Sequence, residues 1–165
     1  MKIPDYEISP AVSEDIPAIF DLQERNLRVN GGALSVRFSR LWFSKAITEM
    51  PIIVARKAKV VVGYVVSTSF NAQKHDPIVR AMLQAYPGSS GSYIYGPICV
   101  AKDHRGQGLA VAMFEQLKAR LPEREGITFI RRDNLASIGV HIKMGMREVA
   151  AFNHRNVGYV VVAYV

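Results

Sequence analysis

The sequence contains a single cysteine, Cys99, among its 165 residues. A lone cysteine excludes an internal disulfide and the usual cysteine-based zinc sites, and it is typical of proteins in a reducing compartment. The isolated histidines His104 and His154 have no nearby carboxylate pattern that would complete a metal site. We therefore expect a cytoplasmic protein and no bound metal.

The chain also lacks a long run of apolar residues. Its N-terminal stretch, MKIPDYEISPAVSEDIPAIF, carries charges at positions 2, 5 and 7 and contains no unbroken apolar core of signal-peptide length. No later segment approaches the length of a membrane span, and no repeat, low-complexity tract or linker interrupts the sequence. These absences predict an unexported protein with no membrane partner, folded as a single domain over residues 1–165.

Positive charge exceeds negative charge, with 21 Lys plus Arg against 14 Asp plus Glu and a net charge of +7. Such an excess raises the local concentration of anionic ligands, phosphates included. The basic residues are scattered, however, and aromatic residues do not alternate with a Lys/Arg stripe as a nucleic-acid-binding surface requires. We expect an anionic ligand and no nucleic acid.

Alternating and helical hydrophobic patterns divide the chain into strands and helices. Strands are expected at 6–12, 51–69 (two strands joined by a basic turn), 92–100, 126–133, 147–155 and 157–165; helices at 13–26, 39–50, 78–86, 108–121 and 135–144. Ser13 is expected to cap the first helix, and Gly96 and Pro97 to break the pairing of their strand. The order predicts an α/β domain with a mixed sheet whose middle strands pair in parallel across helices 108–121 and 135–144.

The turn RGQGLA, residues 105–110, separates a strand from a helix. Glycines allow the backbone to approach a ligand closely, free N–H groups and the helix dipole attract an anion, and Arg105 adds a fixed positive charge. A pyrophosphate fits this arrangement best. Val111 and the short remaining chain exclude a dinucleotide-binding unit, and no Gly-Lys-Ser or Gly-Lys-Thr follows for a P-loop. An ordinary tight strand-to-helix turn stays open.

This turn resembles the acyl-CoA-binding motif R/Q-x-x-G-x-G/A of the GNAT superfamily of N-acetyltransferases, and it matches at each specified place. The order of elements is similar to that family's over nearly the whole chain, apart from an insert at 70–91 and a loop at 28–39. The resemblance implies a mixed, mostly antiparallel sheet that splays at the fourth strand, with helices on both faces.

A second similarity lies in the stretch DNLASIGVHIKMGM. The family often has Asn, a small residue three positions on and Tyr or His seven positions on, as in Asn134, Ser137 and His141 here. These three positions follow one stripe of a helix, and Leu135, Ile138 and Ile142 follow another about 100° away. The spacing alone is equally typical of a solvated polar face, and only the combination with the turn favours a functional site.

The resemblance implies a role for each of these residues. The CoA pyrophosphate would bind at Arg105, Gly106, Gln107, Gly108, Leu109 and Ala110; the pantetheine arm at the backbone of Cys99 and Val100, at Asn134 and at Ser137. A neutral amine would attack the thioester directly, with a backbone N–H near the strand break stabilising the oxyanion. His141 would protonate the departing thiolate, although its place is a tyrosine in many relatives, so that acid, base or neither stays open.

The predicted function is therefore that of an acetyl-CoA-dependent N-acetyltransferase acting on the primary amine of a small molecule. Alternatives are transfer to a peptide or protein amine, at the N-terminus or a lysine, and an acyl-CoA sensor without activity.

Cys99, between two β-branched residues, is typical of a buried hydrophobe and not of a nucleophile. Tyr93 and Tyr95 share one face of their strand. The acceptor, the length of the acyl group and the formation of a homodimer stay open.

Overall fold

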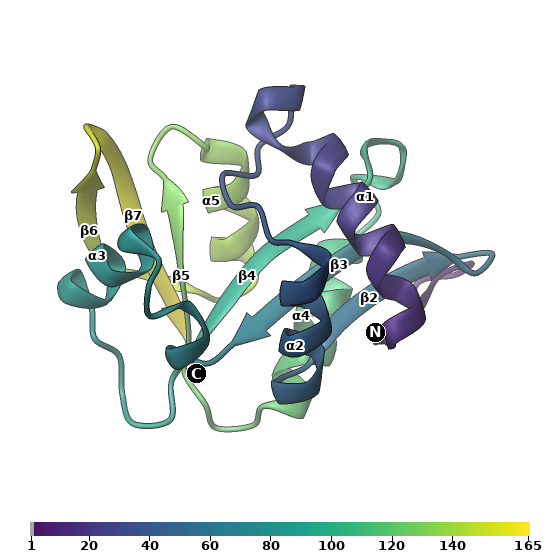
Figure 1. Ribbon diagram of the computed structural model, residues 1–165, viewed down its shortest axis with the longest axis horizontal. Coiled ribbons are helices and arrows are strands. Elements are labelled where there is room, and N and C mark those ends of the chain that lie inside the picture. Colours follow the sequence, from purple (N-terminus) through teal and green to yellow (C-terminus); the bar gives the residue numbers. More distant parts are fainter. Residues whose placement is uncertain (1) are drawn as a thin grey trace. The chain divides into compact units, whose positions relative to one another are not determined.

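The structure is a computed structural model that describes residues 2–165. The chain, whose helices and strands are labelled in Figure 1, forms two compact units, each built from two separate segments. The first unit comprises the chain up to Ser67 together with Gly96–Leu121; the second comprises Thr68–Tyr95 and Pro122–Val165. Across residues 2–165, no helix has the length and apolarity needed to cross a membrane. The expected single domain stays a prediction.

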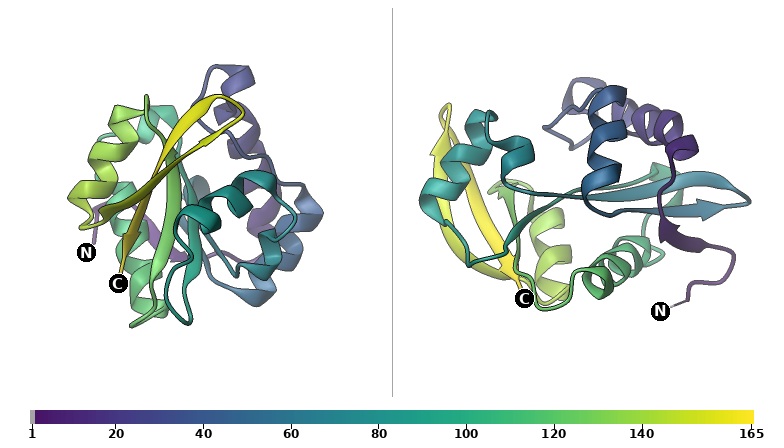
Figure 2. Two further views of the ribbon diagram at one scale, coloured as in Figure 1. Left: turned by 90° about the vertical axis from the view of Figure 1, so that its left-hand side faces the viewer. Right: turned by 60° about the horizontal axis from the view of Figure 1, so that its bottom comes forward.

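The first unit is a sheet covered by helices on both faces. Strands β1 (Glu7–Pro10), β2 (Ile52–Lys57) and β3 (Val60–Thr68) pair antiparallel in that order. Helices α1 (Ile16–Asn26) and α2 (Arg40–Glu49) cover one face, and α4 (Leu109–Arg120) covers the other (Figure 2). Alternation along the strands explains the two layers, because it points successive apolar side chains to opposite faces.

The start of α1 differs from the expectation that Ser13 caps it. Residues Ser13–Asp15 form a short 3-10 turn, and the Asp15 carboxylate accepts a hydrogen bond from the Val12 N–H at 2.8 Å. Asp15 also pairs with Arg56 of β2. The Asp15 carboxylate binds both the Val12 N–H and the Arg56 guanidinium. It caps this end of the helix in preference to the Ser13 hydroxyl, because charge-assisted hydrogen bonds are stronger.

The second unit is built around a sheet of β5 (Gly126–Arg131), β7 (Val157–Tyr164) and β6 (Arg147–His154), with the first part of β4 (Tyr93–Val100) beside β5. Helix α3 (Pro77–Ala85) packs on one face and α5 (Leu135–Lys143) on the other (Figure 2). Ile94 lies in the core under α3, and the next residue, Tyr95, contacts His141 of α5.

Within residues 2–165, the sheet order is β1-β2-β3-β4-β5-β7-β6, and β4 pairs with β5 in parallel. The predicted mixed, mostly antiparallel sheet is confirmed. Parallel pairing across the helix at 135–144 is wrong, because β7 lies between β5 and β6 and is antiparallel to both. The tight turn at Arg155 and Asn156, both at positive φ, keeps β6 and β7 together as a hairpin.

Strand β4 pairs with β5 only at its beginning. Its register with β5 consists of Tyr93 opposite Gly126 and Ile94 opposite Ile127, although β4 continues to Val100. Gly96 then adopts a φ of 93° and Pro97 has no N–H to donate. The predicted break of pairing at this dipeptide is confirmed, and it separates the end of β4 from the β5 ladder.

The residues that precede β4 are held by a buried carboxylate, Glu125. Its oxygens accept hydrogen bonds from the Tyr86 hydroxyl (2.8 Å), the Ser89 backbone N–H (2.9 Å) and the Ser92 hydroxyl (2.8 Å). Burial raises the pKa of Glu125, but these hydrogen bonds outweigh burial and leave its pKa below the ordinary value. The ionised carboxylate thus fixes the segment from α3 to β4 in the second unit.

We expect Glu125→Gln to lower the free energy of unfolding at neutral pH by about 1–3 kcal/mol, because hydrogen bonds to a charged acceptor are lost. A carboxyl with a lowered folded-state pKa stabilises above its unfolded value of about 4.3 and loses that effect as the pH falls through the folded value. Urea unfolding against pH should therefore show wild type and variant converging below about pH 4. The exposed Glu115→Gln is the control, and an equal effect there contradicts the prediction.

Candidate functional site

The turn between β4 and α4, in the first unit, exposes backbone and keeps side chains away. Gly106 and Gly108 have φ of 74° and 80°, a region that favours glycine. A Cβ at Gly106 would meet no described heavy atom within 4 Å, and one at Gly108 only Ile3 Cδ1, at 3.7 Å. The space beside both glycines is therefore open to a ligand.

Helix α4 begins at this turn without a side-chain cap. Gly108 is its N-cap residue, and the hydrogen bond from the Ala112 N–H to the Gly108 carbonyl starts the helical ladder. The N–H groups of the first turn have no partner within a helix, and the helix dipole adds partial positive charge there. Leu109, which is fully buried, anchors the first turn in the core, while Gln107 is exposed and Ala110 half-buried.

Arg105 is fastened to the first unit. Its Nε donates to the Val100 carbonyl at 3.0 Å, and its Nη2 donates to Asn26 Oδ1 at 2.8 Å. Both acceptors are uncharged, so the positive charge is held in place without being neutralised. Sequence reasoning missed Asn26, because it lies on α1 and no local pattern links it to the turn.

The neighbouring His104 is also held by a distant residue. The hydroxyl of Tyr6 lies 2.9 Å from His104 Nδ1, and the two rings meet edge to face. Tyr6 was likewise outside the sequence-based site, since nothing in its surroundings connects it with residue 104. Two side chains from the N-terminal part of the chain therefore fix the conformation of the turn.

Cys99 is buried at the end of β4, in the core that α1 and α2 cover. Burial raises the pKa of its thiol to about 12, against the opposing charges of Arg105 and Arg25. A thiol with this pKa is protonated near neutral pH and is a poor nucleophile. The structure agrees with Cys99 as a small hydrophobe.

The predicted residues of the second unit, Asn134, Ser137 and His141, lie together at one side of α5. Asn134 caps the helix, its Oδ1 accepting from the Ser137 N–H at 3.2 Å. The imidazole of His141 is only 4% exposed and meets the Tyr95 ring edge to face at 5.5 Å. His141 is therefore buried and Asn134 and Ser137 are half-buried, so this stripe is not a fully solvated face.

The apolar side of α5 is correspondingly the outer one. Leu135 is 75% and Ile142 47% exposed, and Val140 is also exposed. The spacing predicted the two faces, but the usual rule for amphipathic helices assigns the apolar face to the core. Here the buried imidazole of His141 is tolerated because its Nδ1 bonds to the helix backbone, and the half-buried Asn134 likewise bonds to the Ser137 N–H.

The hydrogen bond of His141 defines its tautomer. Nδ1 lies 2.7 Å from the Ser137 carbonyl, which can only accept, so Nδ1 carries the hydrogen and Nε2 keeps a lone pair. Burial lowers the pKa of His141, although the bond to Ser137 opposes this shift. The imidazole is therefore neutral near pH 7, and Nε2 is able to accept a proton.

Tyr93 and Tyr95 point to the same face of β4, since both rings contact Tyr164 edge to face, at 6.2 and 6.1 Å. Burial raises the pKa of both hydroxyls.

In the part of the chain from residue 2 onward, no group of three His, Cys, Asp or Glu side chains could hold a metal ion. The absence of a metal stays a prediction.

Comparison with known proteins agrees with this geometry. The profile of the acetyltransferase (GNAT) family matches residues 16–146, and no curated protein sequence matches the chain. Similar structures include a ribosomal-protein-alanine N-acetyltransferase from Brucella melitensis, with a TM-score of 0.73 and 21% identity over 96% of this chain and 99% of that one.

Two further similar structures were determined with acetyl-CoA. A putative acetyltransferase from Salmonella typhimurium has a TM-score of 0.71 at 18% identity, covering 96% of this chain and 92% of that one. A phosphinothricin acetyltransferase from Sinorhizobium meliloti has a TM-score of 0.71 at 21% identity, covering 97% of this chain and 88% of that one. At these identities the likeness establishes the fold.

We expect the His141 imidazole to titrate below its ordinary pKa of about 6.5 and to carry its hydrogen on Nδ1, as observed by ¹⁵N–¹H NMR of the ring. Because the unfolded chain binds a proton at a higher pH than the folded one, the free energy of unfolding should fall as the pH drops below about 6.5. His141→Gln assigns the resonance and should remove this contribution. A hydrogen on Nε2 in the wild type contradicts the assignment.

Proposed function

Since the chain belongs to the acetyltransferase (GNAT) family, and is an acyltransferase, we propose that it transfers the acetyl group of acetyl-CoA to the primary amine of a small molecule. The observation that carries the proposal is the bare turn from Gly106 to α4. Its glycine backbone and uncapped N–H groups suit a pyrophosphate, and Arg105 supplies a fixed positive charge. The acetyl-CoA found in two similar structures supports the same co-substrate.

The pyrophosphate accepts hydrogen bonds from the backbone of Arg105, Gly106, Gln107, Gly108, Leu109 and Ala110. Arg105 acts in two ways, since its bonds to Val100 and Asn26 also hold the turn. A phosphate brought to uncapped N–H groups gains charge-assisted hydrogen bonds and the favourable end of the helix dipole. This fit supports a phosphate site over an ordinary strand-to-helix connection, whose glycines need only provide the bend.

The pantetheine arm binds the ends of β4 and α5. Cys99 and Val100 offer backbone groups at the end of β4, where the Val100 carbonyl also accepts from Arg105. Asn134 uses its Oδ1 as the helix cap, which leaves its Nδ2 to donate to a pantetheine carbonyl. The Ser137 hydroxyl, 3.4 Å from His141 Nδ1, completes this set.

His141 acts as a base in the transfer. Its Nε2 takes a proton from the amine while the amine nitrogen bonds to the thioester carbonyl carbon, and the carbon–sulfur bond then breaks. The proton passes to the departing thiolate, so that the products are an acetamide and the CoA thiol. A neutral imidazole with a lowered pKa is available for this step at neutral pH, whereas an acid would have to start protonated.

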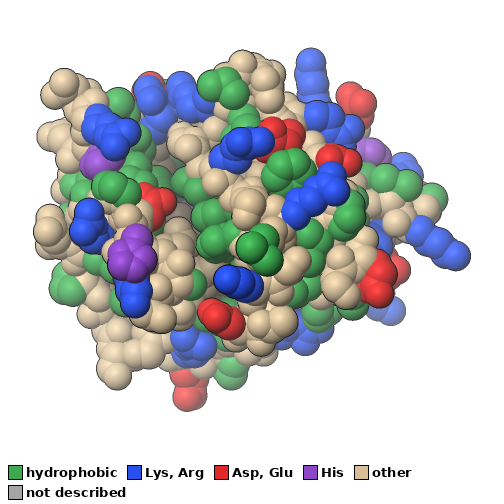
Figure 3. Space-filling model, viewed as in Figure 1, with side chains coloured by type: hydrophobic (Ala, Val, Ile, Leu, Met, Phe, Trp, Pro, Cys, Tyr) green, Lys and Arg blue, Asp and Glu red, His purple; other side chains and the backbone are tan. Residues whose placement is uncertain are grey.

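The acceptor is a small amine in this proposal, and a peptide or protein amine is the alternative. One protein of similar structure is a ribosomal-protein-alanine N-acetyltransferase and another is a phosphinothricin acetyltransferase. The shared fold is therefore compatible with protein acceptors and with small-molecule acceptors. On the face seen in Figure 3, Lys and Arg are scattered among other side chains. The net charge of +7 disfavours a polycationic acceptor, since like charges repel, and the scatter lacks the basic stripe that a nucleic acid would need.

We expect the wild type to release free CoA thiol from acetyl-CoA with at least one member of a panel of primary amines. Gly108→Trp should abolish both thiol release and acetyl-CoA binding in calorimetry, because an indole would occupy the phosphate space. Arg105→Ala should weaken binding less, since the backbone donors remain.

Two results would contradict this assignment. Unchanged affinity in a folded Gly108→Trp protein rules out the turn as the CoA site. Binding of acetyl-CoA without thiol release, for every amine of the panel and for peptides, identifies a sensor instead of an enzyme.

We expect His141→Ala to keep acetyl-CoA affinity within a few-fold while kcat falls by roughly 10²-fold or more, the usual contribution of a general base. Stopped-flow binding and steady-state rates separate the two effects. The acid limb of the kcat/KM profile of the wild type should lie below pH 6.5 and be absent from the variant. Normal turnover in a variant that binds acetyl-CoA returns His141 to a purely structural residue.

A further inference from the structure

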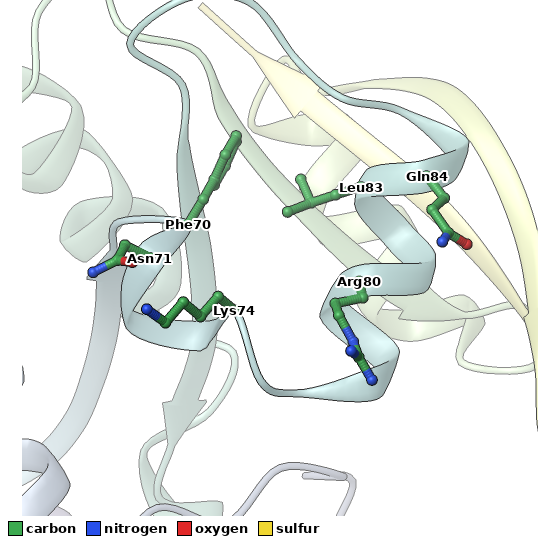
Figure 4. Close-up of a pocket in the computed structure, with 6 residues that line it drawn as sticks. All are labelled: Phe70, Asn71, Lys74, Arg80, Leu83 and Gln84. Atoms are coloured by element: carbon green, nitrogen blue, oxygen red, sulfur yellow. The ribbon is translucent and has the colours of Figure 1, made fainter.

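Exposed cations are held in two different ways in this protein. Lys74 and Arg80 line an open groove of about 520 Å³ in the second unit, between the 3-10 helix η3 (Asn71–Gln73) and α3 (Figure 4). Within residues 2–165, neither side chain forms a hydrogen bond or ion pair, so each would lose rotamer freedom on binding a ligand. Arg105, in the first unit, is instead held before any ligand binds.

The partner of Arg105 on α1, Asn26, has a fixed side chain. Its Nδ2 donates to the Leu22 carbonyl at 2.8 Å, and its Oδ1 accepts from Arg105 Nη2 at 2.8 Å. Because a carbonyl only accepts and a guanidinium only donates, the amide has one possible orientation. Asn26 is 8% exposed, and its backbone carbonyl accepts from the Leu34 N–H at 3.0 Å. Both its side chain and its backbone are therefore held in place.

The guanidinium of Arg105 keeps one edge for a ligand. A guanidinium has five N–H hydrogens; here Nε gives one to Val100 and Nη2 gives one to Asn26. Both hydrogens of Nη1 and the second hydrogen of Nη2 remain, and within residues 2–165 they have no partner. Nη1 and Nη2 together form an edge that can donate two parallel hydrogen bonds to a phosphate. The exposed Arg105 side chain is open to such a ligand.

The charge of Arg105 depends on the residue type at position 26. Glu24, two residues earlier on α1, pairs its carboxylate with Arg37. A carboxylate at position 26 would have nearly the same shape as the amide of Asn26, but it would form such an ion pair with Arg105 and neutralise the guanidinium. The amide gives the same hydrogen bond and leaves the positive charge in full.

We propose that Asn26 is a positioning residue of the cofactor site, whose neutral amide directs the free edge of Arg105 to the pyrophosphate and preserves its charge. This role rests on the proposed function. It differs from that of a residue that only stabilises the turn, because any acceptor of the same size would stabilise the turn. Only an uncharged acceptor both holds the guanidinium and leaves it available to a phosphate.

Asn26→Asp tests the importance of the charge. The variant keeps an acceptor for Arg105, so its free energy of unfolding in urea should stay close to that of the wild type. Its affinity for acetyl-CoA in calorimetry should nevertheless fall about tenfold or more. Asn30→Asp is the matched control, because the Asn30 Nδ2 likewise donates to a carbonyl of α1, that of Glu24, but does not contact Arg105. The control should bind acetyl-CoA as the wild type does.

A kinetic comparison uses S-acetylpantetheine, which has the thioester and the arm of acetyl-CoA but no phosphate. With the most active amine of the panel, Asn26→Asp should raise the KM for acetyl-CoA about tenfold and keep kcat within about twofold. Its kcat/KM with S-acetylpantetheine should equal that of the wild type. A purely structural defect would instead lower the rates with both donors.

A double-mutant cycle of Asn26→Ala and Arg105→Ala completes the test, and it decides alone if Asn26→Asp does not fold. Asn26→Ala should weaken acetyl-CoA binding in the wild type but have no further effect in Arg105→Ala, since Asn26 acts through Arg105. Wild-type affinity in a folded Asn26→Asp protein, or additive losses in the cycle, overturns the role of Asn26 and leaves the proposed function standing. Unchanged affinity in a folded Gly108→Trp protein overturns the proposed cofactor site and the role of Asn26 with it.

Discussion

The pair of hydrogen bonds made by Arg105 is the constraint on which the candidate cofactor site depends. One reaches the end of its own strand, and the other reaches Asn26 on the first long helix. Together they hold the chain where it leaves β4, so that the two glycines turn their backbone outward and α4 starts without a cap. An anion site made of backbone has no side chain to adjust, and its geometry must be provided by residues around it.

The two halves of the proposed chemistry rest on different kinds of support. In the first unit, the turn is rigid because glycine conformation and long-range bonds agree. In the second unit, His141 is directed by a local bond, from Nδ1 to the carbonyl four residues earlier in the same helix. That bond fixes the tautomer, and burial holds the ring neutral. A hydrogen bond between residues four positions apart, such as Ser137 and His141, needs only the helix itself. It is therefore visible in the sequence as an i, i+4 spacing.

The sequence allowed the turn, the strand break at Gly96 and most helices and strands to be predicted, because each has a short-range signal such as a glycine pair or an alternating pattern. The roles of Asn26, Tyr6 and Glu125 could not be predicted, since their partners are distant in the chain. The position of β7 also needed tertiary information, because nothing local says which strand a hairpin joins. The sequence also left open which face of α5 turns toward the core. The reason is different: polar groups that are hydrogen-bonded can be buried at little cost in free energy.

The place of β7 between β5 and β6 affects how the protein is made. A nascent chain synthesised only as far as β6 has β5 and β6 available but no strand to join them, and both would display unpaired edges. The second unit can therefore close only after Tyr164 has left the ribosome, whereas residues 2–121 contain every element of the first unit. Synthesis thus passes through a stage in which the turn for the cofactor can exist while the helix with His141 still lacks its finished sheet, and such a stage is where a chaperone has most to protect.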